Sequence, residues 1–337
     1  MRYLFFIIVF CFSLSCDNNE EWLVPENEIK DGGPEKDGIP SLDNPLFIDV
    51  AETEYISDNT LVLGFRSGDV LRAYPHDILD WHEIINDEVD SSFITVSYCP
   101  LTGTGMAWNR WMNDELNSFG VSGKLYNSNL ILYDKNTDSN WSQLLQQCIN
   151  GAQIGIVPEP TWLVEMPWKT WKKSYPQSKV MSKETGHVRN YGVYPYGAYR
   201  SNHNLLYFPV NNEDNRVPRK ERVFVVFNDG KAKAYRFSSF GEELSIIYDQ
   251  GMVLVGGKND NILLAYYSET LAGKAVELSL ANEELPILLE DSQENKWDIF
   301  GFAIEGPDEG ARLKTVKGNM GYWFAFAAFY PEIELYE

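Results

Sequence analysis

Cysteine, histidine and basic residues are scarce in this sequence. Its 337 residues include four cysteines and four histidines, which excludes a disulfide-stapled scaffold or a protein built around several zinc ions. The 28 lysines and arginines face 49 aspartates and glutamates, which gives a net charge of −21. Because nucleic acids are bound by clustered cations, we expect no nucleic-acid partner. Hydrophobic residues make up 44% of the chain, which is enough for a large core and excludes global disorder.

A short apolar segment stands at the N-terminus. Residues 3–12 are apolar, follow Arg2 and precede small residues that lead to Cys16. This order is typical of a secretory signal, since a membrane-spanning helix needs ~18 apolar residues. Cys16 stands where the lipobox of bacterial lipoproteins has the cysteine that receives lipid after cleavage. We predict a signal peptide over 1–15 and a lipid anchor at Cys16 in a membrane of the bacterial cell envelope, periplasmic or surface-exposed. An ordinary signal peptide with a chance Cys16 is the alternative.

Composition divides the rest of the chain into four parts. Residues 16–37 are rich in Glu, Asp, Asn, Lys, Gly and Pro, which predicts a flexible acidic linker after the lipidated cysteine. Residues 38–180 and 220–337, called here the first half and the second half, read as short alternating strands. Residues 181–219 between them are rich in Tyr and Gly and are called the connector.

The two halves share three landmarks in the same order, which predicts an internal duplication. The paired segments are 61–68 with 223–230, 134–141 with 290–297, and 168–176 with 323–331. No regular alternation of strands and helices is present, so we expect a mostly β or α+β fold of two related β-rich halves packed together. Helical stretches are expected at 75–81, 141–147 and 168–174.

Residues 82–99 predict a β-hairpin with its turn at Asp90-Ser91. Opposed residue numbers then add up to 181, so that His82 faces Cys99 and Asn86 faces Thr95. Alternation places one apolar set on the core face and a polar set on the other face. The polar set is His82, Asn86, Thr95, Ser97 and Cys99. A turn at Asn86-Asp87 is the alternative, and it would break this register.

The polar face of this hairpin suggests a thiol site. Cys99 would be the nucleophile for transfer or hydrolysis, and His82 would lower the pKa of the thiol and move protons. Glu83 or Asn86 would orient the imidazole. The alternatives are a buried structural cysteine and a disulfide between Cys99 and Cys148. Whether the protein is an enzyme or a ligand-binding or assembly module therefore stays open.

Two segments supply candidate binding groups. The Gly-rich turn after Cys99 would expose backbone N–H groups able to hold an oxyanion. The connector would line a pocket with tyrosines and arginines, or else it would be a packed aromatic strap between the halves. The candidate binding residues are Gly103, Thr104, Gly105, Arg189, Tyr191 and Tyr196.

Metal ligands are sparse. Cys99 and His82 are ligands that copper accepts, but no dense ligand spacing supports such a site. Copper or another soft metal at these two residues is therefore kept as an alternative, and the sequence does not identify a cofactor. Residues 134–138 resemble the start of a calcium loop without its later Gly and Glu. A turn in which Asp138 or Ser139 caps the following helix is the favoured interpretation.

Two of these segments resemble the bacterial family catalogued as domain of unknown function 3179. The most specific are Trp81-His82-Glu83-Ile84-Ile85-Asn86-Asp87 and Tyr98-Cys99-Pro100-Leu101-Thr102-Gly103-Thr104. The resemblance covers about residues 38–337 and brings no established reaction. Many relatives carry a second cysteine where this chain has Thr102, which puts a dithiol role in doubt. The second half has Gly256 where the first has Cys99, so any thiol chemistry belongs to the first half.

Overall fold

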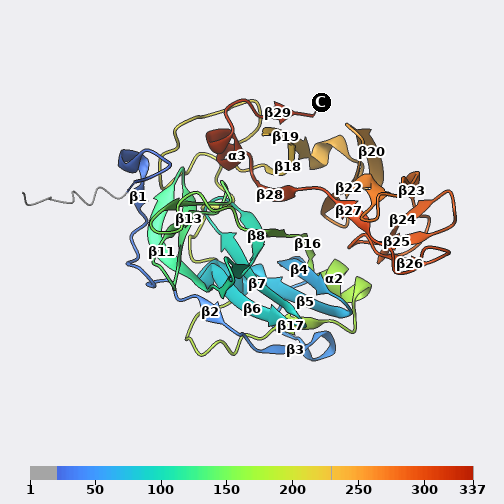
Figure 1. The fold of residues 1–337 in the computed structure, drawn as a ribbon, viewed down its shortest axis with the longest axis horizontal. Helices are drawn as coiled ribbons and strands as arrows, with labels where there is room; N and C mark the ends of the chain where they lie inside the picture. Colours follow the sequence, from blue (N-terminus) through green and yellow to red (C-terminus); the bar gives the residue numbers. More distant parts are fainter. Residues whose placement is uncertain (1–20, 229, 337) are drawn as a thin grey trace, which may run out of the picture.

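The protein is built almost entirely from short strands. The computed structural model describes residues 21–228 and 230–336. The first half, blue to green, lies beside the second half, orange to red (Figure 1). The β-rich class predicted from the sequence is confirmed. The predicted signal peptide, Cys11 and Cys16 lie outside the described residues. Across those that are described, no helix is long and apolar enough to cross a membrane.

Three sheets make up most of the first half. Their strand orders are β16-β4-β5-β17-β3, β15-β8-β7-β6-β2 and β1-β11-β12-β13-β14, and β9 pairs with β10. The strands are β1 (Lys30–Asp31), β2 (Leu42–Asp43), β3 (Phe47–Asp49), β4 (Leu61–Ser67), β5 (Val70–Pro75), β6 (Ile84–Val89), β7 (Ser92–Cys99), β8 (Thr104–Asn109), β9 (Trp111–Met112), β10 (Glu115–Leu116), β11 (Phe119–Tyr126), β12 (Asn129–Asp134), β13 (Asn140–Ser142), β14 (Gln147–Asn150), β15 (Pro160–Thr161), β16 (Val164–Pro167) and β17 (Lys179–Met181). Turn residues such as Gly68 and Asp90 have positive φ, which Gly and Asp adopt more readily than other residues.

The second half also contains three sheets. Their orders are β28-β18-β19-β29, β20-β21-β22-β27 and β23-β24-β25-β26. The strands are β18 (Arg222–Asn228), β19 (Lys231–Arg236), β20 (Ser245–Asp249), β21 (Met252–Gly257), β22 (Ile262–Thr270), β23 (Leu278–Leu280), β24 (Ile287–Asp291), β25 (Lys296–Asp298), β26 (Ala303–Glu305), β27 (Leu313–Thr315), β28 (Gly318–Tyr322) and β29 (Glu334–Leu335). The order β28-β18-β19-β29 matches β16-β4-β5-β17, with two antiparallel pairs and then a parallel pair in each. A common origin by duplication stays a prediction.

Strand pairing shifts the alignment of the halves by one residue. Leu61 pairs with Pro167 and Arg222 pairs with Tyr322, and in each case the partner directly precedes a helix. Leu61 therefore corresponds to Arg222, whereas the sequence aligned it with Val223. The sequence alignment matched the glycines of the two hairpin turns, which occupy different positions of those turns.

Two of the three expected helices are present. The helices are α1 (His76–His82), α2 (Trp168–Ser174) and α3 (Trp323–Phe329), with 3-10 turns η1 (Glu26–Glu28), η2 (Val50–Glu52) and η3 (Phe237–Ser239). The helix expected at 141–147 is wrong, because β13 and β14 pair Trp141 with Cys148 across this stretch. Gln146 between them has φ 52°, which no helix accommodates.

The start of the described chain is packed, not extended away from the fold. β1 pairs with β11, Trp22 forms a bridge with Asn150, and Val24 is buried with Ile131 and Ile149. The flexible linker predicted over 16–37 is therefore wrong from residue 21 onward. The few apolar side chains in this polar stretch pack against a sheet of the first half, and composition alone does not predict this contact.

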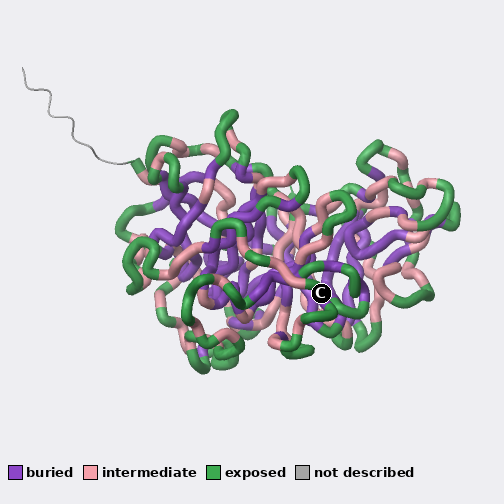
Figure 2. The backbone as a smooth tube through the Cα atoms, turned by 90° about the horizontal axis from the view of Figure 1, so that it is seen from below, coloured by how far each residue is buried: buried purple, intermediate pink, exposed green. Residues whose placement is uncertain are grey.

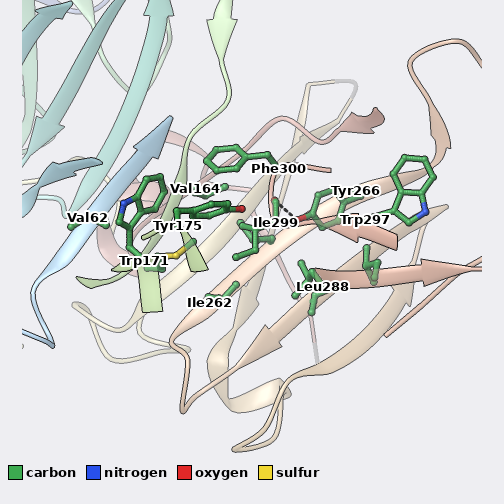
Figure 3. Packing of buried hydrophobic residues seen from close by; sticks show 14 of the residues in the cluster. Val62, Val164, Trp171, Tyr175, Ile262, Tyr266, Leu288, Trp297, Ile299 and Phe300 are labelled. Atoms are coloured by element: carbon green, nitrogen blue, oxygen red, sulfur yellow. Dashed lines mark hydrogen bonds between the residues drawn. The ribbon is translucent and has the colours of Figure 1, made fainter. Parts of the chain in front are cut away.

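The hydrophobic core runs through both halves. Buried backbone fills the interior of each half and exposed backbone lies on the outer loops (Figure 2). The largest cluster joins residues of α2, β4 and β16 to residues of the second half, as Figure 3 shows. Phe300 packs its ring against Trp171, Tyr175 and Trp162, with centroids 6.2, 5.6 and 6.1 Å away. The two halves therefore share a core, and β28 lies beside β8 at their junction.

Candidate functional site

The predicted hairpin is present in the predicted register. β6 and β7 pair Asn86 with Thr95 and Ile84 with Ser97, and both pairs add up to 181. The turn lies at Asp90-Ser91, so the alternative turn at Asn86-Asp87 is wrong. Both faces of the hairpin are buried, because Thr95 and Ser97 of the polar face are as buried as Val96 of the apolar face. Alternation was sufficient to predict the register, since a shift by one residue would exchange the polar and the apolar set.

His82 does not lie on this hairpin. It is the last residue of α1, and its fully buried ring contacts two other groups. Nδ1–H donates to the carbonyl oxygen of Pro40 at 2.8 Å, and Nε2 accepts from the Tyr191 hydroxyl at 2.6 Å. Burial lowers the pKa of His82 to about 4, so the ring is neutral at pH 7. The prediction that His82 faces Cys99 across the strands is wrong, because α1 includes His82 and β6 begins only at Ile84.

Glu83 joins α1 to β6 in an unusual backbone conformation. Its φ of 57° and ψ of −34° lie outside the regions that side chains other than Gly normally adopt. The carboxyl is buried, and Oε1 accepts a hydrogen bond from the Tyr196 hydroxyl at 3.1 Å. Burial raises the pKa of Glu83 to about 8, and nearby Asp80 adds to the shift. At neutral pH this carboxyl therefore holds its proton, and it is Tyr196, not His82, that it contacts.

The connector covers α1 and its carboxyls. Arg200 donates to both carboxylate oxygens of Asp80, at 2.8 and 2.7 Å, and its guanidinium lies 3.7 Å from the centre of the Tyr194 ring. Burial raises the pKa of Asp80 to about 7, against the opposing effect of Arg200. Of the predicted connector residues, Tyr191 and Tyr196 meet the α1 region, whereas the Arg189 side chain donates only to the carbonyl oxygen of Val188 within the described part of the chain.

Asn86 has a structural role. Its Nδ2 donates to Asp43 Oδ1 at 2.7 Å and to the carbonyl oxygen of Phe119 at 2.8 Å. Its Oδ1 accepts from Thr95 Oγ1 at 2.8 Å and from the Phe119 amide at 3.0 Å. All four hydrogen-bonding positions of the amide are used in joining β2, β6, β7 and β11. Asn86 therefore orients neither His82 nor Cys99.

Cys99 is a buried thiol. Only 1% of the residue is exposed, and Sγ lies 3.8 Å from the carbonyl oxygen of Ser128. Burial raises the pKa of the Cys99 thiol to about 11, and Glu83 adds to the shift. Cys99 and Cys148 are both free, so the predicted alternative of a disulfide between them is wrong. The environment favours the thiol form, whereas a nucleophilic cysteine needs a lowered pKa.

The Gly-rich turn after Cys99 is packed against the second half. A Cβ at Gly103 would lie 3.0 Å from the Tyr322 ring, and the φ of Gly103 is +63°. A Cβ at Gly105 would lie 2.7 Å from Leu63. These glycines thus permit close contacts between chain segments, and Tyr322 covers the backbone that the sequence suggested for an oxyanion.

Thr104 belongs to a buried network of hydroxyls and amides. Thr104 donates to Gln143 Oε1 at 2.6 Å and shares a 2.8 Å contact with the Thr102 hydroxyl. Asn129 Nδ2 donates to Thr102 Oγ1 at 3.0 Å and to Gln143 Oε1 at 2.8 Å. Thr102 therefore joins β8 to β12 through Thr104 and Asn129.

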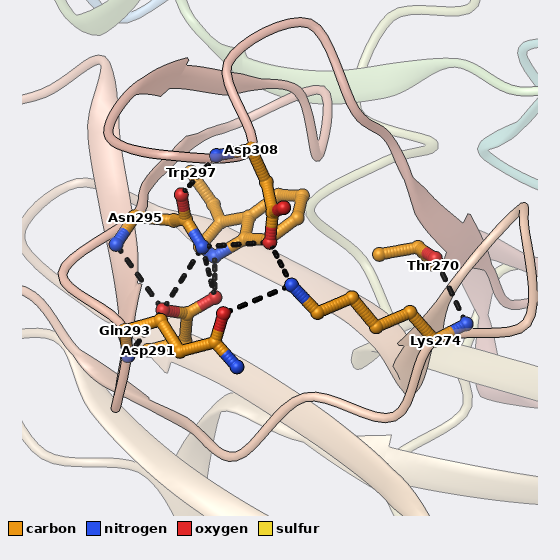
Figure 4. Close-up of polar contacts among 7 residues, drawn as sticks. All are labelled: Thr270, Lys274, Asp291, Gln293, Asn295, Trp297 and Asp308. Atoms are coloured by element: carbon orange, nitrogen blue, oxygen red, sulfur yellow. Dashed lines mark hydrogen bonds and ion pairs between the residues drawn. The ribbon is translucent and has the colours of Figure 1, made fainter.

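The loop at 134–138 closes on its own side chains. Asp134 accepts from the Thr137 amide at 2.6 Å and from the Trp141 indole at 2.9 Å. No helix follows, so the capping role expected of Asp138 or Ser139 is wrong, and Ser139 instead accepts from the Gln153 amide at 3.1 Å. The second half has a similar loop around Asp291, drawn in Figure 4. Residues 21–228 and 230–336 contain no group of three or more His, Cys, Asp or Glu side chains placed to hold a metal.

A cleft between the halves is the feature that the sequence did not indicate. It has a volume of about 760 Å³ and is lined from β4, β7, β8 and β9 on one side and β27 and β28 on the other. Trp111, which is 52% exposed, lines it together with Arg66 and Arg312. These three residues are far apart in the sequence and belong to no motif, so only the packing of the halves brings them together.

Comparisons with known proteins identify one family. A family model described as "Protein of unknown function (DUF3179)" matches residues 36–333, which confirms the resemblance found in the sequence. No curated protein and no solved structure matches the chain.

Proposed function

The chain belongs to the DUF3179 family, and from that premise we propose that it is a lipid-anchored protein of the bacterial cell envelope that binds a ligand between its halves. The observation that carries the binding function is the cleft of about 760 Å³, a volume typical of small-ligand sites. An aromatic side chain that is half exposed inside such a cleft, as Trp111 is, offers a ligand apolar contact area that the described residues leave uncovered.

The alternative of a thiol enzyme is less well supported by the geometry. Cys99 is buried, its pKa is raised, and neither hydrogen-bond partner of His82 is a thiol. Copper binding at Cys99 and His82 is disfavoured for a similar reason, since both ring nitrogens of His82 already have partners. A binding protein needs none of these groups to react.

Blocking the cleft tests the binding function. Asn319 lines the cleft from β28, so Asn319→Trp would fill it, while Val188→Trp adds the same bulk at a position that is 96% exposed. The three proteins are incubated with small-molecule and oligosaccharide extracts of bacterial cells and examined by native mass spectrometry. We expect a complex with the unaltered protein and with Val188→Trp, and none with Asn319→Trp. Equal binding by all three would place the ligand elsewhere.

Fatty-acid labelling tests the anchor. In bacteria fed an alkyne-bearing fatty acid, the full chain should carry the label and sediment with membranes. Cys16→Ala should lose both properties, whereas Cys11→Ala should keep them, because Cys11 leaves with the signal peptide. Label retained by Cys16→Ala would contradict the lipid anchor.

Alkylation separates the thiol hypothesis from the binding hypothesis. Iodoacetamide should leave Cys99 unmodified in the folded protein at pH 8 and modify it in denaturant, and Cys148, which is also buried, should behave alike. Rapid modification of Cys99 alone would instead favour an activated thiol.

A further inference from the structure

The cleft between the halves differs in charge from the rest of the chain. Its lining contains three cations, Arg66, Arg312 and Lys317, and one carboxylate, Glu159. The whole chain has 28 basic and 49 acidic residues, so the local ratio is reversed. An acidic protein that gathers cations in one cleft attracts anions there and repels them elsewhere.

Two of these cations form no ion pair within the part of the chain that the structure describes. The Arg312 and Lys317 side chains form no hydrogen bond or ion pair with any described residue, although Nε of Arg312 is buried. The two terminal nitrogens of Arg312 are neither buried nor hydrogen-bonded to a described residue, so they are the donors that a ligand oxygen can reach. Glu159 is already engaged, because its Oε2 accepts from Asn109 at 3.0 Å.

Arg66 and Arg312 form a doubly charged pair around one aromatic ring. Their guanidinium carbons lie 4.0 and 4.8 Å from the centre of the Phe302 ring. Arg66 is neutralised by the buried Asp298, which accepts from Nη1 at 2.6 Å. One positive charge at Arg312 is left, and a guanidinium offers the paired donors that a carboxylate accepts.

The remaining lining suits a sugar chain. Trp111 is half exposed and is held by Phe93, whose ring centre is 6.1 Å away, so one face of its indole is free to stack on a sugar ring. The amide and hydroxyl groups of Gln146, Thr161, Thr315 and Asn319 also line the cleft. None of these four side chains has a hydrogen-bond partner within 21–228 and 230–336, so they are available to sugar hydroxyls.

We infer that the cleft binds an acidic oligosaccharide, with a sugar carboxylate on Arg312 and a sugar ring on Trp111. This inference rests on the proposed binding function and names its ligand class. A neutral sugar would leave Arg312 without a counter-charge, and an acidic peptide would make little use of the exposed indole.

Isothermal titration with three defined probes tests the inference. Hexagalacturonate is the acidic sugar, maltohexaose the neutral sugar and hexaglutamate the acidic peptide. We expect hexagalacturonate to bind at least tenfold more tightly than the others, with an affinity that falls as salt rises. Arg312→Gln and Trp111→Ala should each weaken its binding about tenfold or more.

Lys314→Gln is the matched control. Lys314 lies two residues from Arg312, is paired with Glu269 at 2.6 Å and does not line the cleft, so its loss should change the affinity less than twofold. Equal binding of hexaglutamate that Trp111→Ala leaves unchanged would overturn the sugar assignment. Preference for maltohexaose, or no effect of Arg312→Gln, would overturn the acidic assignment while the binding function stands. Absence of any complex with all three probes would overturn the inference, and the extract experiment above then decides on the binding function separately.

Discussion

The first half and the second half repeat the same contacts, and they differ mainly around α1. In each half a tyrosine of the second hairpin strand donates to a carboxylate of the next strand that a cation also contacts. In the first half Tyr74 donates to Asp87 at 2.7 Å beside Arg72. In the second half Tyr235 donates to Asp249 at 2.7 Å beside Lys233.

The acidic loops of the two halves are also alike. Asp134 accepts from the Trp141 indole at 2.9 Å, and Asp291 accepts from the Trp297 indole at 3.2 Å. In the second loop Asn295 joins Asp291 to Asp308, which pairs with Lys274, as Figure 4 shows. Shared contacts of this kind hold each half together and need no ligand.

The region after the hairpin differs between the halves. The first half has the helix α1, followed by the buried Glu83, and the second half has only the three-residue turn η3 at the corresponding place. Cys99 corresponds in the sequence alignment to Gly256. The Phe240 ring occupies the space that a side chain at Gly256 would need. Contacts that both halves share therefore stabilise the fold, whereas the α1 region is specific to the first half.

The largest effect is expected at a contact between a strand and a helix. The first half combines a small strand residue with a large helix residue there, and the second half combines a larger strand residue with a smaller helix residue. A Cβ at Gly64 would lie 2.1 Å from the Trp171 ring. By strand pairing, Gly64 and Trp171 correspond to Val225 and Phe326 of the second half. Gly64→Val should lower the free energy of unfolding by about 3 kcal/mol or more through overpacking, measured by urea denaturation.

The second half supplies the control for this substitution. Val225→Ala should cost only about 1–2 kcal/mol, since it removes a buried branch without a clash. Adding Trp171→Phe to Gly64→Val should restore part of the loss, because the smaller ring frees space. If the double variant is no more stable than Gly64→Val alone, overlap with the Trp171 ring is not the cause of the loss.

The acidic loops should contribute similarly to the two halves. Asp134→Ala and Asp291→Ala each remove the acceptor of a buried indole N–H and of loop amides. Each should lower the free energy of unfolding by about 2–3 kcal/mol, as measured by urea denaturation. If the free energy of unfolding falls in only one of the two variants, the two loops are not equivalent.

Glu83 gives the first half a pH dependence that the second half lacks. Its folded pKa of about 8 lies above its unfolded value, so the folded state binds the proton more strongly and stability falls as pH rises from 5 to 8. Glu83→Gln cannot ionise. Relative to the unaltered protein, it should gain about 3–4 kcal/mol between pH 5 and pH 8, read from urea denaturation at both values.

Asp249 of the second half should behave in the opposite way. Burial alone would raise its pKa, but hydrogen bonds from Lys233 and Tyr235 lower it. Its contribution is present above the unfolded pKa and is lost only as pH falls below about 4. Asp249→Asn should therefore show no difference between pH 5 and pH 8. A flat profile for Glu83→Gln as well would mean that Glu83 is ionised in the folded state.

The smallest effect is expected at the tyrosine that each half uses to hold a carboxylate. Tyr74→Phe should cost about 1 kcal/mol, because the Asp87 side chain is 3% exposed and cannot take water in its place. Tyr235→Phe should cost less, since the Asp249 side chain is 18% exposed. Thermal denaturation of both variants measures the difference, and a larger loss in Tyr235→Phe would reverse the comparison.

Local patterns in the sequence predicted the β-rich class, the hairpin register and two helices. The register of β6 and β7 follows from alternation, because a shift by one residue would turn Ile85 and Val96 out of the core. The helix at 168–174 follows from the spacing of Trp168 and Trp171. The helix expected at 141–147 is wrong because the preceding strand and loop take its groups: Asp134 accepts from the indole of Trp141, and Asn129 accepts from the amide of Leu144.

At the candidate thiol site the sequence did not predict which side chains contact one another. His82, Glu83 and Cys99 are all buried, and all three lie close to the end of α1. Their contacts were not predictable, because Tyr191, Tyr196 and Pro40 reach them from segments that local patterns do not place.

The sequence by itself determined the strands, the turns and the family of this protein, because these depend on side-chain alternation, on glycine conformations and on short motifs. The tertiary structure decided which side chains meet. It gave Cys99 and His82 different hydrogen-bond partners, packed Tyr322 over Gly103, and brought Trp111 and Arg312 to one cleft. Such contacts depend on how the two halves pack across a shared core, and the spacing of residues along the chain does not encode that packing.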